Sequence, residues 1–241
     1  MIKHCFIFSI NRNDPVGDRF YFRFHSKECI RFFGPWLTRY ETYRSFDVLA
    51  EAAIARYGVM SPGRVTELWY RSVDEWNEAK PNSRPYTAPP GGWQRGTSTV
   101  PRPVTMVPAM PTEDFLGKEP SPEQCPIIRW YQAIKYPDGV KVEDGEKWYK
   151  EVYAKQACQQ KGLLRFASWK TVANCPFPTP WVRFTEMWYE SVEAWHNAIV
   201  ESPPKYTAPK WAKEAPFVDM SSILIPYKPQ VDFLKDNPLI P

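Results

Sequence analysis

Histidine is the side chain best suited to moving a proton near neutral pH, and the chain has three of them. His25 is the first catalytic candidate, because it falls in line with Phe22, Cys29 and Phe32 at the spacing of a helix. That spacing places His25 on the apolar side of the helix, where it should point toward a sheet. A partly buried imidazole there could accept or deliver a proton, although a core histidine bonded to the backbone would leave the same pattern.

His4 is the second catalytic candidate. It alternates with Cys5 along an apolar run that is typical of a buried strand. Neighbouring side chains of a strand point to opposite faces, so one of these two side chains would line the interior of a barrel. When the two halves of the chain are compared, His4 falls opposite Arg129.

Glu67 and Glu186 are ionisable residues within otherwise apolar, aromatic segments. Burial would raise their pKa values and suit them to proton transfer, whereas pairing with Arg39 or Arg165 on a neighbouring strand would stabilise their anions. Arg39, Arg129 and Arg165 are also candidates for binding the carboxylate or phenolate of a substrate.

Two tyrosines, Tyr86 and Tyr206, each begin the sequence Tyr-Thr-Ala-Pro within long proline-rich loops, Pro81 to Pro103 and Pro203 to Pro216. Each phenol could hydrogen-bond a ligand at the mouth of a pocket while its ring stacks on that ligand. Each ring could instead only hold its loop against the body of the protein. The loops themselves could cover a pocket.

Motifs of the common catalytic classes are absent from the sequence. We find no phosphate-binding glycine loop after a strand, no G-x-S-x-G and no H-x-x-x-H spacing that could hold a metal. We therefore expect no metal and no organic cofactor. The remaining possibilities are acid–base or electrostatic chemistry without a cofactor, or simple binding.

Composition limits the class of protein further. The chain has 241 residues, 43% of them hydrophobic, and a net charge of +4 that is scattered, which gives little support for nucleic-acid binding. Five cysteines without a C-x-x-C pair suggest a reducing compartment, and no apolar run is long enough for a membrane helix, so we expect a cytoplasmic protein. Aromatic residues make up 16%, and these rings could pack a core or line a pocket for a flat ligand.

The elements that position these residues occur twice. Val65–Ala79 and Phe184–Ala198 share the pattern Thr-Glu-x-Trp-Tyr-x-Ser-Val-x-x-Trp, about half a chain length apart. We interpret the chain as a tandem duplication with a boundary near residue 120, giving units 1–120 and 121–241. The period is too long for a solenoid repeat, so each copy should be a small domain.

Each unit is predicted to have the order β-α-β-β-α-β of a ferredoxin-like fold. In the first unit we expect strands over Ile2–Ile10, Leu37–Phe46, Arg64–Ser72 and Val104–Met110, helices over Asp18–Phe33 and Val73–Lys80, and a short inserted helix over Asp47–Tyr57. In the second we expect strands over Ile127–Lys135, Leu163–Val172, Trp181–Ser191 and Ser221–Tyr227, and helices over Glu143–Lys161 and Val192–Val200. The fold class is α+β, with two sheets that bury both faces and close as a pseudo-twofold barrel around a ring-lined hollow.

The chain resembles the EthD-like branch of the dimeric α+β barrel superfamily. The resemblance lies in the aromatic first strand, the helix bearing His25, the segments Leu37–Tyr40 and Glu67–Trp76, and the terminal Asp-Phe-Leu, with the second-half counterparts Leu163–Phe166, Glu186–Trp195 and Asp232–Leu234. It implies one chain folding into what relatives often build as a dimer. It also implies cofactor-free isomerases, cyclases, decarboxylating lyases or monooxygenases of aromatic or polyketide-like metabolites.

The function hypothesis is a cofactor-independent lyase or decarboxylase acting on an aromatic catabolic intermediate, for example a lignin-derived one. In this hypothesis His25 moves a proton, an arginine holds an anionic group, and rings bind the small aromatic substrate. The alternatives are a cofactor-free monooxygenase or isomerase, and a non-catalytic small-molecule-binding or stress-response module. Among partners, the hypothesis includes neither nucleic acid nor membrane, and it leaves a homodimer open.

Overall fold

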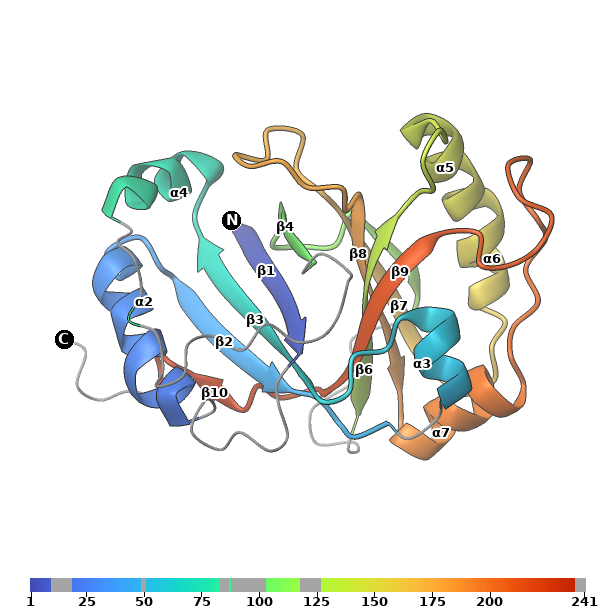
Figure 1. Cartoon of the computed structure of the whole chain (residues 1–241), viewed down its shortest axis with the longest axis horizontal. Coiled ribbons are helices and arrows are strands. Elements are labelled where there is room, and N and C mark those ends of the chain that lie inside the picture. Colours follow the sequence, from blue (N-terminus) through green and yellow to red (C-terminus); the bar gives the residue numbers. More distant parts are fainter. Residues whose placement is uncertain (10–18, 49–50, 83–86, 88–102, 118–126, 237–241) are drawn as a thin grey trace.

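Two antiparallel sheets of five strands each form the framework of the molecule. The computed structural model describes residues 1–9, 19–48, 51–82, 87, 103–117 and 127–236, with only the backbone of residues 52–54. Sheet A has the strand order β10-β2-β3-β1-β4, and sheet B has the order β5-β7-β8-β6-β9. Figure 1 shows the two sheets meeting at the centre of the molecule, with helices on both flanks.

The strands alternate in sequence with helices. Sheet A consists of β1 (Ile2–Ser9), β2 (Arg39–Arg44), β3 (Gly63–Tyr70), β4 (Val104–Pro108) and β10 (Val231–Asp232), and sheet B of β5 (Glu113–Leu116), β6 (Ile128–Lys135), β7 (Leu163–Lys170), β8 (Arg183–Tyr189) and β9 (Asp219–Pro226). The helical elements are η1 (Tyr21–His25), α2 (Ser26–Phe33), α3 (Glu51–Tyr57), α4 (Val73–Ala79), η2 (Lys80–Asn82), α5 (Val142–Trp148), η3 (Tyr149–Tyr153), α6 (Ala154–Ala157), α7 (Val192–His196) and η4 (Asn197–Glu201).

The predicted fold class is confirmed. Without the added edge strands, both sheets have the same order, β4-β1-β3-β2 in sheet A and β9-β6-β8-β7 in sheet B, which is that of a ferredoxin-like unit. Both faces of each sheet are buried. Helices α2 and α4 cover the outer face of sheet A, helices α3 and α5 to α7 cover that of sheet B, and the two inner faces pack on each other.

The sheets exchange their edge strands. Strand β5, which follows the last strand of the first ferredoxin-like unit, pairs with β7 in sheet B. Strand β10, at the end of the second unit, pairs with β2 in sheet A. These are the two Asp-Phe-Leu segments, which were not predicted as strands, so each sheet has five strands where four were expected. Each sheet is therefore completed by a segment from the other half of the chain.

The inserted helix α3 also crosses between the halves. It belongs to the first half, but it packs on sheet B, and the segment after it bonds to β9 through the amide of Met60 and the carbonyl of Ser222 at 2.7 Å. Gly58 makes this crossing possible, because its φ is +55° and a Cβ would collide with the carbonyl oxygen of Met220. As a result, residues of the first half contribute to the outer face of sheet B.

The repeated Ser-Val pairs begin helices. Ser72 Oγ accepts a hydrogen bond from the amide of Glu75 at 3.1 Å, and Ser191 Oγ accepts one from the amide of Ala194 at 3.0 Å. A side-chain cap of this kind stabilises a helix by about 1 kcal/mol. The shared sequence pattern is therefore explained in part by the start of α4 and α7, independently of any activity.

Candidate functional site

Four charged side chains lie between the two sheets, and we call them the interior ion cluster: Lys3, Glu67, Arg129 and Glu186. Lys3 Nζ lies 3.6 Å from Glu67 Oε1, and Arg129 Nη1 lies 3.3 Å from Glu186 Oε1. All four side chains are buried. The register of β1 on β3 and of β6 on β8 produces this arrangement, because it places each cation diagonally across from a glutamate on the same face.

Aromatic side chains surround the cluster and link the halves. The Tyr131 hydroxyl of sheet B donates to Glu67 Oε1 of sheet A at 3.3 Å. Lys3 Nζ lies 4.2 Å from the centre of the Trp169 ring, and the guanidinium of Arg129 lies 4.4 Å from the centre of the Tyr43 ring. Cations over ring faces are favourable, more so away from water. The cluster therefore joins the sheets through contacts in both directions.

The charges of the cluster compensate for its burial. Burial by itself would raise the pKa of the Glu186 carboxyl, but Arg129 and Lys3 hold this pKa below its ordinary value. Burial likewise would lower the pKa of the Lys3 amine, but Glu67 raises it above its ordinary value. Both shifts favour the charged forms of Glu186 and Lys3, as expected for a structural ion pair, and Glu186 is not adapted to donate a proton.

The predicted partners, Arg39 and Arg165, are not the closest cations to the glutamates, although Arg165 does contribute to lowering the pKa of Glu186. Arg39 lies opposite Trp69 on the neighbouring strand and pairs with Glu41 at 3.6 Å, and Arg165 pairs with Asp114 at 2.9 Å. Comparison of the sequences also placed His4 opposite Arg129, but the strand register makes Lys3 the counterpart of Arg129. The cause is a shift of one residue, which in a strand changes the face of the sheet.

The expected ring-lined hollow between the sheets is not found among the described residues. Apolar side chains from both inner faces pack there in one cluster that includes Cys5, Val65, Phe184 and Ile223, each fully buried. The cluster leaves the interior ions enclosed by protein. The structure thus brings Glu67, Glu186 and Arg129 together in the described part of the barrel, in a setting that suits stability.

His4 lies on the opposite face of sheet A from the ion cluster, beneath α4. The indole N–H of Trp76 donates to His4 Nδ1 at 3.2 Å, so in the neutral imidazole Nε2 carries the proton. Only 7% of His4 is exposed, and burial lowers its pKa to about 3. His4 is therefore a neutral hydrogen-bond donor near neutral pH, and its catalytic role stays a prediction.

His25 ends η1 on the same outer side of sheet A, with its ring 5.5 Å from that of Tyr21. It is partly exposed, and burial lowers its pKa to about 4 although Glu28 acts to raise it. Sheet A separates His25 from the interior glutamates. The structure therefore does not bring the predicted histidine and glutamates into one site, and the proton transfer assigned to His25 stays a prediction.

The low pKa of His4 gives a prediction about acid stability. An unfolded histidine titrates near 6.5 and folded His4 near 3, so the unfolded state alone binds this proton between those pH values. The stabilisation is complete above pH 6.5 and is lost as the pH falls. For His4 the loss at pH 5 should be about 2 kcal/mol. Urea unfolding at pH 7 and pH 5 should show a smaller pH effect in His4→Phe, and an equal effect in both proteins would contradict the burial.

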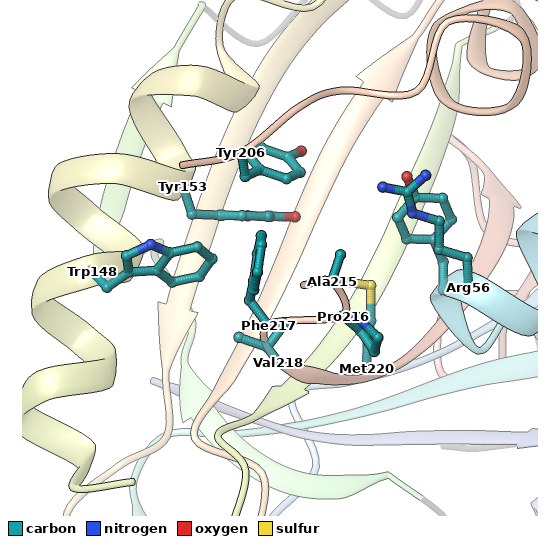
Figure 2. A pocket seen from close by; sticks show the side chains of 10 residues that line it. Arg56, Trp148, Tyr153, Tyr206, Ala215, Pro216, Phe217, Val218 and Met220 are labelled. Atoms are coloured by element: carbon teal, nitrogen blue, oxygen red, sulfur yellow. The ribbon is translucent and has the colours of Figure 1, made fainter. Parts of the chain in front are cut away.

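A cavity of about 40 Å³ lies on the helix-covered side of sheet B (Figure 2). Its lining residues come from α3, α5, η3, β9 and the loop before β9: Arg56, Tyr57, Trp148, Tyr153, Tyr206, Ala215, Pro216, Phe217, Val218 and Met220. The volume accommodates roughly three waters. It therefore fits a polar group or the edge of one ring, and a larger ligand requires the residues at its mouth to move apart.

Phenol groups and a guanidinium face one another across this cavity. The rings of Tyr153 and Tyr206 lie 4.6 Å apart, and Figure 2 shows their hydroxyls pointing toward Arg56. Tyr206 Oη accepts a hydrogen bond from Gln160 Nε2 at 3.0 Å. The hydroxyl of Tyr57 is buried and has no hydrogen-bond partner among the described residues. An unpaired buried hydroxyl is costly, so it is available to bond a ligand or a water.

The electrostatics of the cavity suit an anion. Burial raises the pKa of Tyr57, Tyr153 and Tyr206, so these phenols remain protonated and can donate hydrogen bonds. Arg56 is exposed and adds a positive charge at the edge. None of the ten lining residues is a carboxylate or a histidine. The site can thus stabilise an oxygen anion on an aromatic ligand, and it offers no carboxylate or imidazole base of its own.

Sequence reasoning found part of this cavity. Tyr206 was predicted at the mouth of a pocket, and the loop Pro203 to Pro216 does line one. Tyr86 lies outside the described residues. Tyr57 and Tyr153 were not predicted as site residues. The inserted helix that ends at Tyr57 was predicted, and its insertion between two strands was the signal that could have identified Tyr57.

Other chemistry is limited in the part of the chain that the structure describes. Cys5, Cys29, Cys158 and Cys175 form no disulfide, and burial, followed by Glu67, raises the pKa of Cys5 to about 12, which makes it a poor nucleophile. No group of three or more histidine, cysteine or acidic side chains among the described residues could hold a metal ion. Within the same residues, no helix has the length and apolarity needed to cross a membrane.

Comparison with known proteins identifies the fold. No protein-family model matches the sequence, and no curated protein matches it. An anthrone oxidase-like protein superposes with a TM-score of 0.52 at 11% identity, over 93% of this chain and 90% of that one. A mutant chlorite dismutase from Candidatus Nitrospira defluvii superposes with a TM-score of 0.45 at 12% identity, over the same shares of the two chains. The first likeness, with the sheet order, shows that this chain has the dimeric α+β barrel fold, and it shows no more than the fold.

Proposed function

We propose that the protein is a cofactor-independent oxidase or monooxygenase of a small aromatic molecule that bears a phenol or an enolisable ketone. The observation that carries the proposal is the cavity on sheet B, where neutral phenols and Arg56 face the same small space. The anthrone oxidase-like fold relative supports the same reaction class. The sequence suggested a cofactor-free monooxygenase as an alternative to a lyase, and we now favour this alternative.

The chemistry follows from stabilising an anion. Hydrogen bonds from Tyr57 and the charge of Arg56 lower the pKa of a bound phenol or enol, whose proton passes to solvent. The resulting anion is electron-rich and can give electrons to dioxygen directly. For a ring methylene that is conjugated with a carbonyl through aromatic rings, as in anthrone, one dioxygen enters, one oxygen atom becomes the new carbonyl, and the other leaves as water with the two methylene hydrogens. The oxidant is dioxygen itself.

The hypothesis of a lyase or decarboxylase has less support. It required a histidine to move the proton, and His25 lies on sheet A whereas the cavity lies on sheet B. None of the ten residues lining the cavity is a histidine or a carboxylic acid that would protonate the carbanion left by a decarboxylation. A binding module without activity would use the same cavity, and it is distinguished by the absence of turnover.

We also infer that the two halves are copies of one unit, with the boundary near residue 120. Equal sheet orders and the paired positions of Glu67 and Glu186 on β3 and β8 support this origin. Membership of the EthD-like branch, a cytoplasmic location and a homodimer remain predictions. The copies differ at the outer face of each sheet, which is where the candidate sites lie.

The test of the function uses anthrone as the probe. Under air we expect oxygen uptake and a product that has gained one oxygen and lost two hydrogens, measured with an oxygen electrode and by mass spectrometry. Tyr57→Phe should lower kcat by about 100-fold, the scale of losing one donor to a developing anion. Tyr70→Phe is the matched control, because its hydroxyl on sheet A is also buried without a described partner.

The outcomes separate the alternatives. Carbon dioxide release without oxygen uptake from a panel of phenolic acids would restore the lyase. Turnover that is equally reduced in Tyr57→Phe and Tyr70→Phe would show that the cavity takes no part in catalysis. Binding of anthrone without conversion would leave a binding module.

A further inference from the structure

His4 has a buried nitrogen for which the described residues provide no hydrogen-bond partner. Nδ1 accepts from the indole of Trp76 at 3.2 Å, and Nε2, which then carries the proton, has no hydrogen-bond partner in the part of the chain that the structure describes. The residue is 7% exposed. A native structure rarely leaves such a group unpaired unless a ligand or water completes it. The edge of the imidazole turned away from Trp76 is thus available to a hydrogen-bond acceptor.

In the other half of the chain, the position that corresponds to His4 is filled by an apolar ring. Trp130 on β6 takes the place of His4, and Trp195 takes that of Trp76. The Trp130 and Trp195 rings meet edge to face at 5.8 Å, as do those of His4 and Trp76 at 5.7 Å. The Tyr57 ring packs on Trp130 at 5.2 Å, so in sheet B a ring from the other half of the chain covers this position. Sheet A differs in having an imidazole there, which is smaller than an indole and has a second polar nitrogen.

In sheet A, Phe177 provides the covering ring from outside the unit. Its ring lies 4.9 Å from His4 and 5.7 Å from Trp76, and it is partly exposed, so it covers the buried imidazole on the solvent side. Phe177 belongs to the loop between β7 and β8, in the other half of the chain. That loop is tied to β4 through Val172 N to Met106 O at 2.9 Å and Thr179 Oγ1 to Val104 O at 2.7 Å.

We propose that His4, Trp76 and Phe6 form a second ligand site, which Phe177 occupies in this structure and which a monocyclic phenol takes when Phe177 turns away. The ligand ring replaces that of Phe177 against Trp76 and Phe6, and its oxygen accepts the hydrogen bond of His4 Nε2. The Phe6 ring lies 4.2 Å from His4 and completes the wall. The site is on sheet A, apart from the cavity on sheet B, and it stands whether or not the protein oxidises its substrate.

A cationic hydrogen-bond donor, Lys80, lies at the rim of the site. Lys80 Nζ lies 5.3 Å from the centre of the Trp76 ring and is exposed to solvent. A phenol that approaches past Lys80 meets a cation first and a neutral donor at the end of the site. An apolar ring of the same size lacks the oxygen that both groups recognise. The site should therefore discriminate phenol from toluene, which has a methyl group in place of the hydroxyl.

The experiment uses the nitrogen resonances of the three histidines in the full chain labelled with ¹⁵N-histidine, at pH 7. His4 is assigned by its absence in His4→Phe, and it should show the tautomer with the proton on Nε2. Phenol is expected to shift the His4 Nε2 resonance, and toluene is expected to leave it unchanged. Phe177→Ala should tighten phenol binding by about ten-fold or more, since the ligand no longer competes with the ring.

Phe115→Ala is the matched control, since it removes a partly buried phenylalanine from sheet B, and it should leave the affinity for phenol at this site unchanged. If Phe177→Ala does not fold, Phe177→Leu replaces it with the same expectation. Absence of a His4 shift with phenol in both the native protein and the Phe177 variant would overturn the proposal. Equal affinity of the Phe177 variant for phenol and toluene would overturn it too, because His4 would then play no part.

Discussion

Glu186→Leu should lower the free energy of unfolding by about 3–5 kcal/mol. The substitution leaves the guanidinium of Arg129 buried between the sheets without its carboxylate. Nε and Nη2 of Arg129 have no hydrogen-bond partner among the described residues, so Glu186 provides its main compensation. Urea unfolding at pH 7, followed by tryptophan fluorescence, measures the change.

A double variant distinguishes a lost ion pair from a lost contact. Arg129→Met combined with Glu186→Leu removes both charges and should recover most of the stability, since apolar residues of similar volume often replace buried pairs without loss. The control is Asp219→Asn, which breaks the partly exposed pair with Lys135 at 2.9 Å and should change stability by less than about 1 kcal/mol. A double variant as unstable as Glu186→Leu alone would mean that the damage arises from packing and not from charge.

Phe233→Ala should be the second most damaging change, with an expected loss of about 3–5 kcal/mol. Phe233 follows β10 and is 5% exposed, and its ring lies 4.6 Å from Tyr40 and 5.7 Å from Phe22. It therefore holds the exchanged edge strand against the core of sheet A. Urea unfolding measures the loss, and binding of a hydrophobic dye reports exposure of that edge.

Phe115→Ala is the matched variant at the corresponding place of the first half. Phe115 is partly exposed and lies 5.1 Å from the Phe166 ring, so its removal should cost less than that of Phe233. Losses in the reverse order would contradict the assignment of Phe233 as the anchor of its strand.

Sequence periodicity was sufficient for the long elements. Strands such as β1 and β6 are continuous apolar runs bounded by turn residues, and helices α4 and α7 begin at a serine cap, so both signals are local. The edge strands β5 and β10 carry no such signal, because four and two residues are too few to show alternation. Their pairing depends on which sheet lies nearby, and a single sequence does not contain that information in local form.

The ionisable residues also show which features the local sequence predicts and which depend on the folded structure. Glu67 and Glu186 were singled out as ionisable residues within apolar strands, and both are buried in β3 and β8. Their closest partners were missed, because a diagonal pair depends on strand register, and a shift of one residue moves a side chain to the other face. The cavity on sheet B was found only through Tyr206, since Tyr57 reaches it on a helix that crosses from the other half.

The exchange of edge strands sets an order for folding during protein synthesis. Sheet B takes its extra strand β5 from a segment made before its other strands, so it can be complete once β9 has left the ribosome. Sheet A begins with β1 but lacks β10 until the residues after β9 have been added. Domains usually complete their folding in the order in which they are translated. In this chain the sheet that is started first is finished last.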